Sequence, residues 1–199
     1  EYKVGFEWSA PWRYKRLWEF LDTPEPHSME DSLALQRDYH SVLTRRVLAL
    51  LPELAKTNPN SGGPLLASWD QRLDADSAAA ALWNVWFYRY LSPALGRSLN
   101  EDEEPPAGTL STQTTLALLG TDKGQATAVT SLREAWAATS ELLGGDASKW
   151  QWGDLHQIVF KHPLLDRANA NLAEHMRIKP YPRGGSANTT NNTGFGADN

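Results

Sequence analysis

The sequence contains no cysteine in its 199 residues. Disulfide frameworks, thiol nucleophiles and cysteine-based zinc sites are therefore excluded for this chain. An excess of positive charge is also lacking, since the formal net charge is −5, and this argues against a nucleic-acid partner. The most apolar stretch, residues 78–91, is interrupted by Asn84 and Arg89 and is shorter than the roughly 20 residues of a bilayer span. We expect it to form a buried helix and not a membrane segment.

Several motifs of common enzyme sites are missing as well. No Gly-x-Ser-x-Gly segment places a nucleophilic serine on a sharp turn, and neither Ser68 nor Ser186 has a comparable context. The glycine pairs at 62–63 and 184–185 are not followed by the Lys-Ser or Lys-Thr of a phosphate-binding loop. A self-contained Ser-His-Asp triad stays open, because such triads are recognised by geometry and not by sequence order.

Tryptophan, in contrast, is abundant, with nine residues in the chain. The indole ring is large and apolar, and its N–H group needs a partner when buried. We expect most of these side chains in large packed surfaces, including surfaces against other parts of a longer protein. The alternative is a groove in which tryptophan rings stack on a sugar or an aromatic ligand.

Apolar periodicity and capping residues predict a mainly α-helical chain. The first helix is expected at 11–21, with Pro11 in its first position. The second is expected to begin at Ser28, the capping residue, and to continue with its apolar period to Leu54. Pro52 should kink or restart this second helix.

The third helix is expected to begin at Asp74 or Asp76 and to end near Leu91, where Pro93 and Gly96 follow. It is apolar on nearly all sides and should be buried. Two weaker helices are expected at 111–119 and 126–143, and the chain should turn irregular from 150 onward. Residues 1–183 are therefore predicted to form a helical segment, and residues 184–199, rich in Gly, Asn and Thr, a flexible connection.

Residues 150–164 hold the densest cluster of residue types that occur in functional sites. Asp154, His156 and His162 could be metal ligands, although their spacing matches no helical His-x-x-x-His signature. We favour a structural interpretation, in which the imidazoles are held by carbonyl oxygens.

Arg13 and Arg16 are neighbours on the first predicted helix, so both guanidinium groups could share one carboxylate-rich surface. A surface salt bridge is the default interpretation of the pair. His27 and His40 are expected to be exposed or packed in an ordinary way.

A series of motifs carries a resemblance to a known family. In chain order, the motifs are Phe6-Glu7-Trp8-x4-Arg13-x2-Arg16-Leu17, Leu35-Gln36-x-Asp38-x2-Ser41, Leu66-x2-Trp69-Asp70, Ala79-Ala80, Leu82-Trp83, Trp152-Gly153-Asp154-Leu155-His156-x3-Phe160-x-His162-Pro163-Leu164, and Gly184-Gly185 with Thr190-x-Asn192. Together they resemble the penicillin acylase family, which includes cephalosporin and acyl-homoserine-lactone acylases. The Trp-Gly-Asp-Leu-His block is the most specific part.

The resemblance implies an N-terminal-nucleophile hydrolase that is exported as a precursor, to the periplasm or beyond, and cuts itself into two chains. The first residue of the larger chain is then a serine whose own α-amine serves as base, with an asparagine in the oxyanion hole. This sequence resembles the helical middle of the larger chain, an irregular helical subdomain packed on an αββα sandwich. The serine and the asparagine would lie upstream of Glu1, and the closing strands beyond Asn199. The segment alone is therefore expected to be inactive, with the small chain and the rest of the large chain as its partners and an N-acyl amide as the substrate of the whole enzyme.

One active-site element carries over residue by residue. The family has an arginine five residues after a tryptophan, and Trp8 and Arg13 match this pattern, so the resemblance implies a supporting catalytic role for Arg13. Family members often bind a structural calcium ion between the chains. Tyr2 stands about where one ligand is expected, and we expect no metal in this chain.

Two hypotheses from other classes remain beside the acylase. The chain could be a free-standing helical interaction module, or a domain that binds glycans or aromatic ligands. The sequence starts without a signal-peptide pattern and both of its ends have the composition of cut ends, which we take as an expectation of a longer parent.

Overall fold

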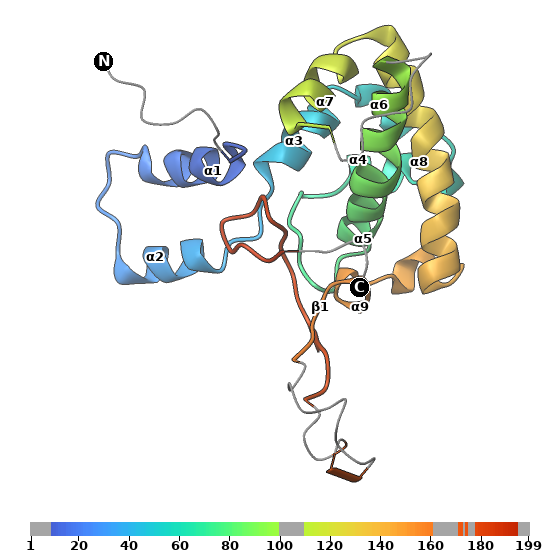
Figure 1. Cartoon of the computed structure of the whole chain (residues 1–199). Helices are drawn as coiled ribbons and strands as arrows, with labels where there is room; N and C mark the ends of the chain where they lie inside the picture. Colours follow the sequence, from blue (N-terminus) through green and yellow to red (C-terminus); the bar gives the residue numbers. More distant parts are fainter. Residues whose placement is uncertain (1–8, 100–109, 161–170, 173, 175–177, 195–199) are drawn as a thin grey trace.

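Helices account for most of the chain in the computed structural model, which describes residues 9–99, 110–160, 171–172, 174 and 178–194 (Figure 1). The elements in chain order are α1 (Trp12–Leu21), α2 (Met29–Gln36), α3 (Val42–Ala49), the 3-10 turns η1 (Pro52–Lys56) and η2 (Pro59–Ser61), α4 (Gly63–Ala67), α5 (Ala78–Asn84), the π-helical segment η3 (Val85–Leu91), α6 (Ser92–Leu99), α7 (Thr112–Leu119), α8 (Asp122–Leu143), the 3-10 turn η4 (Ala147–Lys149), α9 (Trp152–Leu155), β1 (Gln157–Ile158) and β2 (Tyr181–Pro182). The prediction of a mainly α-helical chain is confirmed for the described residues.

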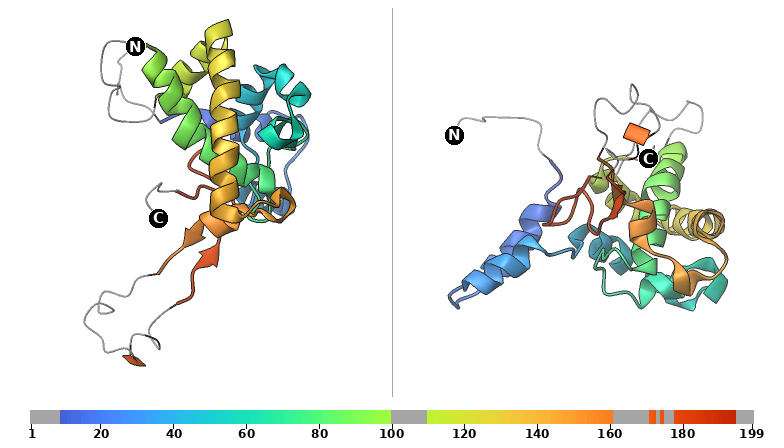
Figure 2. Two further views of the ribbon diagram at one scale, coloured as in Figure 1. Left: turned by 90° about the vertical axis from the view of Figure 1, so that its right-hand side faces the viewer. Right: turned by 90° about the horizontal axis from the view of Figure 1, so that it is seen from below.

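The core lies around the central helix formed by α5, η3 and α6, along which α8 packs (Figures 1 and 2). Trp83, Trp86 and Phe87 are buried here, and the Trp83 and Phe87 rings stack with their centroids 4.9 Å apart. The Trp86 indole donates a hydrogen bond to the Ser131 hydroxyl of α8 at 3.0 Å. The expectation of a buried helix at this place is therefore confirmed.

The prediction of one long helix from 28 to 54 is wrong, because the chain leaves the helix at Arg37 and starts α3 only at Val42. His40 forms an antiparallel bridge with Arg72, and Ser41 donates its backbone N–H to the carbonyl of Gln71. These pairings with a distant segment replace intrahelical bonds. Ser28 caps α2 through a capping box with Asp31, and η1 restarts the chain at Pro52, as expected.

The start and the end of the third helix also differ from the prediction. Ser77, and neither Asp74 nor Asp76, caps α5 by accepting the N–H of Ala80. Pro93 does not end the helix, since α6 continues to Leu99. The turn before it is widened to the π form, in which the N–H of Ser92 bonds to the carbonyl of Phe87, five residues back. A wider turn relieves the clash between a proline ring and the carbonyl four residues earlier.

The other predicted helices are present with small shifts. Helix α1 begins one residue after Pro11, which lies at the capping position, and α7 is capped by Ser111. Helix α8 begins four residues before its predicted start at 126, with Thr121 as its cap, and ends at Gly144 with a positive φ of 93°. No helix among the described residues combines the length and apolar character needed to cross a bilayer.

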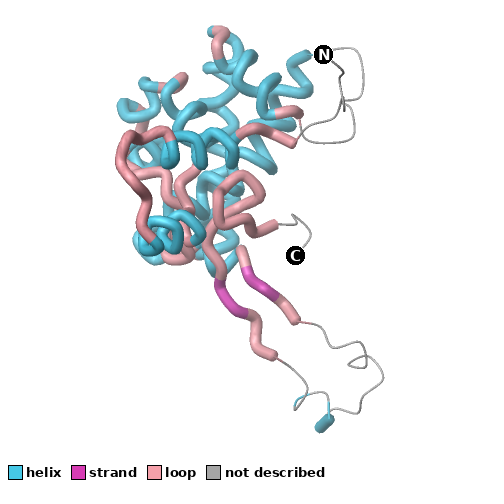
Figure 3. The backbone as a smooth tube through the Cα atoms, turned by 90° about the vertical axis from the view of Figure 1, so that its left-hand side faces the viewer, coloured by secondary structure: helices cyan, strands magenta, loops and turns pink. Residues whose placement is uncertain are grey.

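Two parts extend from the helical body. Helices α1 and α2 form a pair on one side, and no residue of α2 is buried (Figure 2). Strands β1 and β2 leave the body side by side as a narrow arm, with Gln157 opposite Pro182 and Ile158 opposite Tyr181 (Figure 3).

The expectation of a flexible connection does not hold for residues 184–194. Ser186 and Thr189 are buried, and the N–H of Gly185 bonds to the carbonyl of Leu73 at 2.7 Å. The Thr193 hydroxyl donates to the carbonyl of Gly184 at 2.7 Å. Backbone groups of this polar segment are satisfied by the helical body, so it packs despite its composition. Residues 195–199 lie outside the described part.

Candidate functional site

Arg13 lies in the second position of α1 and is half-buried. Among the residues that the structure describes, no hydrogen bond or ion pair of its guanidinium group is found. Trp8, its companion in the motif, and Tyr2 lie outside the described residues. A half-buried guanidinium group with no acceptor among the described residues can bind a carboxylate or a carbonyl group from another segment.

Helix α1 contacts the body through one face. Trp12, Arg16 and Glu19 share this face because they are spaced by four and three residues. The Trp12 side chain is buried and its indole donates to the Thr112 hydroxyl of α7 at 2.9 Å. Glu19 pairs with Arg45 of α3 at the exposed end of the contact.

The opposite face of α1 is apolar and exposed. Tyr14, Trp18 and Leu21 follow the same spacing on this face and are 62, 56 and 55% exposed. An exposed apolar stripe on a helix is typical of a contact with another segment or protein.

Between the two ends of the contact lies the Asp38 cluster, which consists of Arg16, Asp38 and Arg72. The Arg16 Nε lies 2.5 Å from Asp38 Oδ2, and the Arg72 Nη1 lies 3.7 Å from Asp38 Oδ1. Asp38 is only 6% exposed. Arg16 thus forms the ion pair that is the default interpretation, and among the described residues Arg13 forms no ion pair with Asp38 or Glu19, so the two guanidinium groups share neither carboxylate there.

His40 lies next to this cluster and lines a small pocket of about 120 Å³ together with Arg16, Arg45 and Asp70. Burial lowers the pKa of the His40 imidazole below its ordinary value of 6.5, and the negative charge of Asp38 opposes this shift. His27 is exposed and stacks on Phe20, with ring centroids 4.9 Å apart. Both histidines therefore have the ordinary packing that the sequence predicted.

The Trp-Gly-Asp-Leu-His block joins α9 to the C-terminal loop. The Trp152 indole donates to the carbonyl of Gly185 at 3.0 Å. The His156 ring nitrogens lie 3.0 Å from two carbonyl oxygens, Nδ1 from that of Arg183 and Nε2 from that of Gly194. The structural interpretation of this histidine is thereby confirmed, because both nitrogens face backbone acceptors. Asp154 is exposed, and His162 lies outside the described residues.

The chemistry that the described residues could support by themselves is limited. Within them no group of three or more His, Asp or Glu side chains could hold a metal ion, so the residues at hand do not fit the structural calcium that the family implies. The absence of a metal from this chain stays a prediction.

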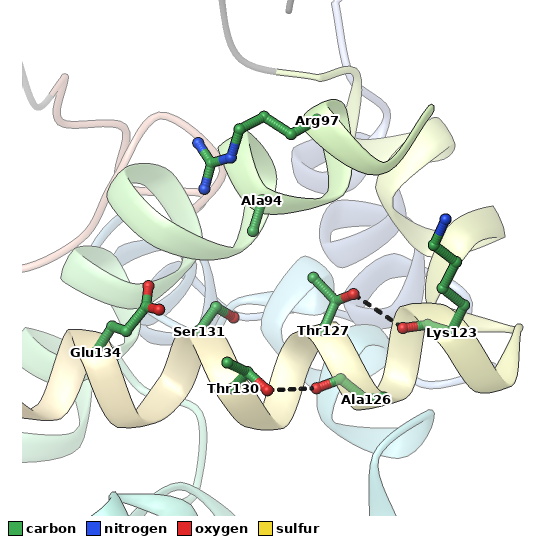
Figure 4. A pocket seen from close by; sticks show the side chains of 8 residues that line it. All are labelled: Ala94, Arg97, Lys123, Ala126, Thr127, Thr130, Ser131 and Glu134. Atoms are coloured by element: carbon green, nitrogen blue, oxygen red, sulfur yellow. Dashed lines mark hydrogen bonds between the residues drawn. The ribbon is translucent and has the colours of Figure 1, made fainter. Parts of the chain in front are cut away.

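A surface groove of about 320 Å³ lies between α6 and α8 (Figure 4). Arg97, Lys123 and Glu134 lie along it, with the hydroxyls of Thr127 and Thr130 between them. Both hydroxyls donate to carbonyl oxygens of α8 itself, at 2.9 and 3.2 Å. The groove offers scattered charges and no converging polar groups, so we assign it no site.

Most of the tryptophans belong to the core. The buried ones are Trp12, Trp69, Trp83, Trp86, Trp150 and Trp152. A buried ring cannot stack on a sugar or an aromatic ligand, so the hypothesis of an aromatic-ligand or glycan-binding groove loses its basis for these six residues. Trp18 alone among the described tryptophans is largely exposed.

Asp38 is the residue that sequence reasoning underestimated. The sequence indicates it only as part of a motif, between Gln36 and Ser41, on a segment predicted to be helical. An acidic residue close to the apolar face of an amphipathic segment was the available signal, because a buried carboxylate requires a partner.

The family model for penicillin amidase matches the chain over residues 1–199. No curated protein was found to match the chain.

Proposed function

The chain belongs to the penicillin amidase family, and from this premise we propose that it is the helical part of the larger chain of an exported acylase that hydrolyses N-acyl amide bonds. The family match over the whole chain carries this proposal. The catalytic serine and the oxyanion asparagine belong to polypeptide upstream of Glu1, and the closing strands to polypeptide downstream of Asn199. The parent is an enzyme of the periplasm or the exterior.

Arg13 has a supporting role in that active site. Its position five residues after Trp8 follows the family pattern, and its half-buried guanidinium group has no partner among the described residues. Because a guanidinium group is planar and permanently charged, it can bind a carboxylate or backbone carbonyl group in a fixed direction close to the oxyanion. The described part of the chain thus supplies a positioned cation, and the missing parts supply the groups that break the bond.

The other parts of the acylase, the small chain and the rest of the large chain, are the partners of this segment. The exposed apolar face of α1, made by Tyr14, Trp18 and Leu21, supports such a contact, since these side chains remain in water in the isolated chain. Any structural calcium of the parent is bound by residues outside the described segment.

The proposal is tested with Arg13→Ala in the intact enzyme. We expect kcat to fall roughly 10- to 100-fold, which corresponds to about 1.4–2.7 kcal/mol of lost transition-state stabilisation, with little change in melting temperature. Arg46→Ala is the matched control, because Arg46 is an exposed arginine of the nearby α3. An unchanged kcat together with a lowered melting temperature would assign Arg13 a purely structural role.

A second experiment tests the fragment itself. Residues 1–199 alone, incubated with phenylacetyl and long-chain acyl amides, should release no product above background. Turnover by this polypeptide would show that a complete reaction centre lies within it.

A further inference from the structure

Asp38 joins three parts of the molecule through one buried carboxylate and its own backbone. Its Oδ2 accepts from Arg16 Nε of α1 at 2.5 Å, and its Oδ1 accepts the backbone N–H of His40 at 3.1 Å. Its carbonyl oxygen accepts the N–H of Asn191 in the C-terminal loop at 3.0 Å. Helix α1, the segment before α3 and the C-terminal loop therefore meet at this residue.

The bond to Arg16 constrains the rotation of α1 about its axis, together with the hydrogen bond from the buried Trp12 indole to the Thr112 hydroxyl at 2.9 Å. Of the polar contacts on the body-facing side of α1, the pair of Glu19 and Arg45 is exposed by 36 and 49% and is expected to contribute little. The Arg16–Asp38 pair is charge-assisted and largely buried, with 23 and 6% exposure, and a guanidinium–carboxylate bond constrains direction as well as distance.

Arg13 precedes Arg16 by three residues and is therefore its neighbour on the helix surface. A rotation of α1 that breaks the Arg16–Asp38 bond moves the Arg13 guanidinium group with it. We infer that Asp38 is a positioning residue of the acylase, which acts through Arg16 and α1 to place Arg13 in the active site. This inference rests on the function proposed above.

A role in stability alone would not require this arrangement. A buried ion pair offsets its own desolvation cost only in part, and an apolar pair of similar size often stabilises a fold equally well. What the ion pair adds is a defined orientation, and misplacing a catalytic group by about 1 Å can lower a rate on the order of 100-fold.

The test is a double-mutant cycle in the intact acylase. Asp38→Asn keeps the size of the side chain and an oxygen for the N–H of His40, but removes the charge that holds Arg16. We expect kcat to fall roughly 10- to 100-fold with KM nearly unchanged. In the Arg13→Ala background, Asp38→Asn should lower kcat no further, because the group that it positions is already gone.

The outcomes separate the two proposals. Fully additive effects of Arg13→Ala and Asp38→Asn on kcat in an active enzyme would overturn the positioning role and leave the acylase function in place. Absence of any N-acyl amide hydrolysis by the wild-type enzyme, measured first on a series of N-acyl p-nitroanilides, would overturn both.

Two further variants complete the design. Arg45→Ala removes the exposed pair on the same face of α1 and should leave kcat unchanged, which controls for a general loosening of the helix. Arg16→Lys keeps the charge and loses the Nε donor, and its effect should also vanish in the Arg13→Ala background. If Asp38→Asn fails to fold, this second cycle decides, and additivity there overturns the inference.

Discussion

Gly153 lies where three segments approach one another, and a methyl group at this position should not fit. It is a buried residue of α9, and its N–H bonds to the carbonyl of Ala75 just before α5. A Cβ atom added to Gly153 would lie 2.6 Å from Cβ of Pro182 in β2 and 3.1 Å from the carbonyl oxygen of Ala75. Pro182 cannot turn aside, because its ring is rigid and its strand is paired with β1 through Gln157.

The expected cost of Gly153→Ala follows from this clash. Overpacking by one methyl group in a rigid environment destabilises a protein by about 1–3 kcal/mol. In a chain of this size each kcal/mol lowers the melting temperature by roughly 2–4 °C, so a fall of roughly 2–12 °C is expected. Alanine also reduces the entropy of the unfolded chain, which offsets about 0.4–1 kcal/mol and places the result toward the lower end of this range.

Thermal unfolding followed by circular dichroism at the helix band, with hydrogen exchange of the β1–β2 amides, measures the effect. Gly145→Ala is the matched control, because nothing lies within 4 Å of the added Cβ and its φ is not in the left-handed region. Its melting temperature should equal or slightly exceed that of the wild type. If Gly153→Ala has the same melting temperature as Gly145→Ala, the junction of α9 and β2 is not tightly packed and the reasoning is refuted.

Two more predictions concern buried polar groups. Ser131→Ala should lower the free energy of unfolding by about 1–3 kcal/mol in chemical denaturation, because the Trp86 indole N–H loses its acceptor inside the core; the exposed Thr130→Ala is its control, and equal effects of the two would contradict the prediction. His40→Gln should flatten the fall in stability that occurs below about pH 6.5. Burial lowers the pKa of His40 in the folded chain, so the unfolded chain takes up the proton first, and stability that is fully present above the ordinary value of 6.5 is lost as the pH falls through the folded-state pKa. Identical pH profiles of the two proteins would show that His40 does not contribute.

Local signals in the sequence were sufficient to predict helix starts and ends where a neighbour along the chain satisfies the hydrogen-bonding groups of the backbone. Ser28 and Ser111 cap the helices that follow them, and Gly144 ends α8 with a positive φ. The apolar character of residues 78–91 on all sides indicated a buried helix, and the structure buries most of that segment. The motif pattern also indicated the family, which the match over residues 1–199 establishes.

Local signals failed to predict the secondary structure where a distant segment competes for the same backbone hydrogen-bonding groups. The apolar period from Leu35 to Leu54 continues through residues 37–41, yet these residues pair with 71–73 and leave the helix. The proline at 93 is an ordinary stop signal, yet the π-helical turn before it lets the helix continue. In both places tertiary packing outweighs a local preference that is worth only a few kcal/mol.

The candidate site likewise has features that the sequence predicts and features that only the tertiary structure shows. The sequence by itself determined that Arg13 and Arg16 share a helix, since helix propensity and the spacing of apolar residues depend on neighbours only. The tertiary structure alone decided which of them is paired, because the carboxylate that binds Arg16 is 22 residues away along the chain. It likewise decided that the loop after residue 184 is packed, since the groups that satisfy it come from Leu73, Trp152 and His156. Contacts of this kind arise only when separate segments meet in space, and no local property of either segment encodes them.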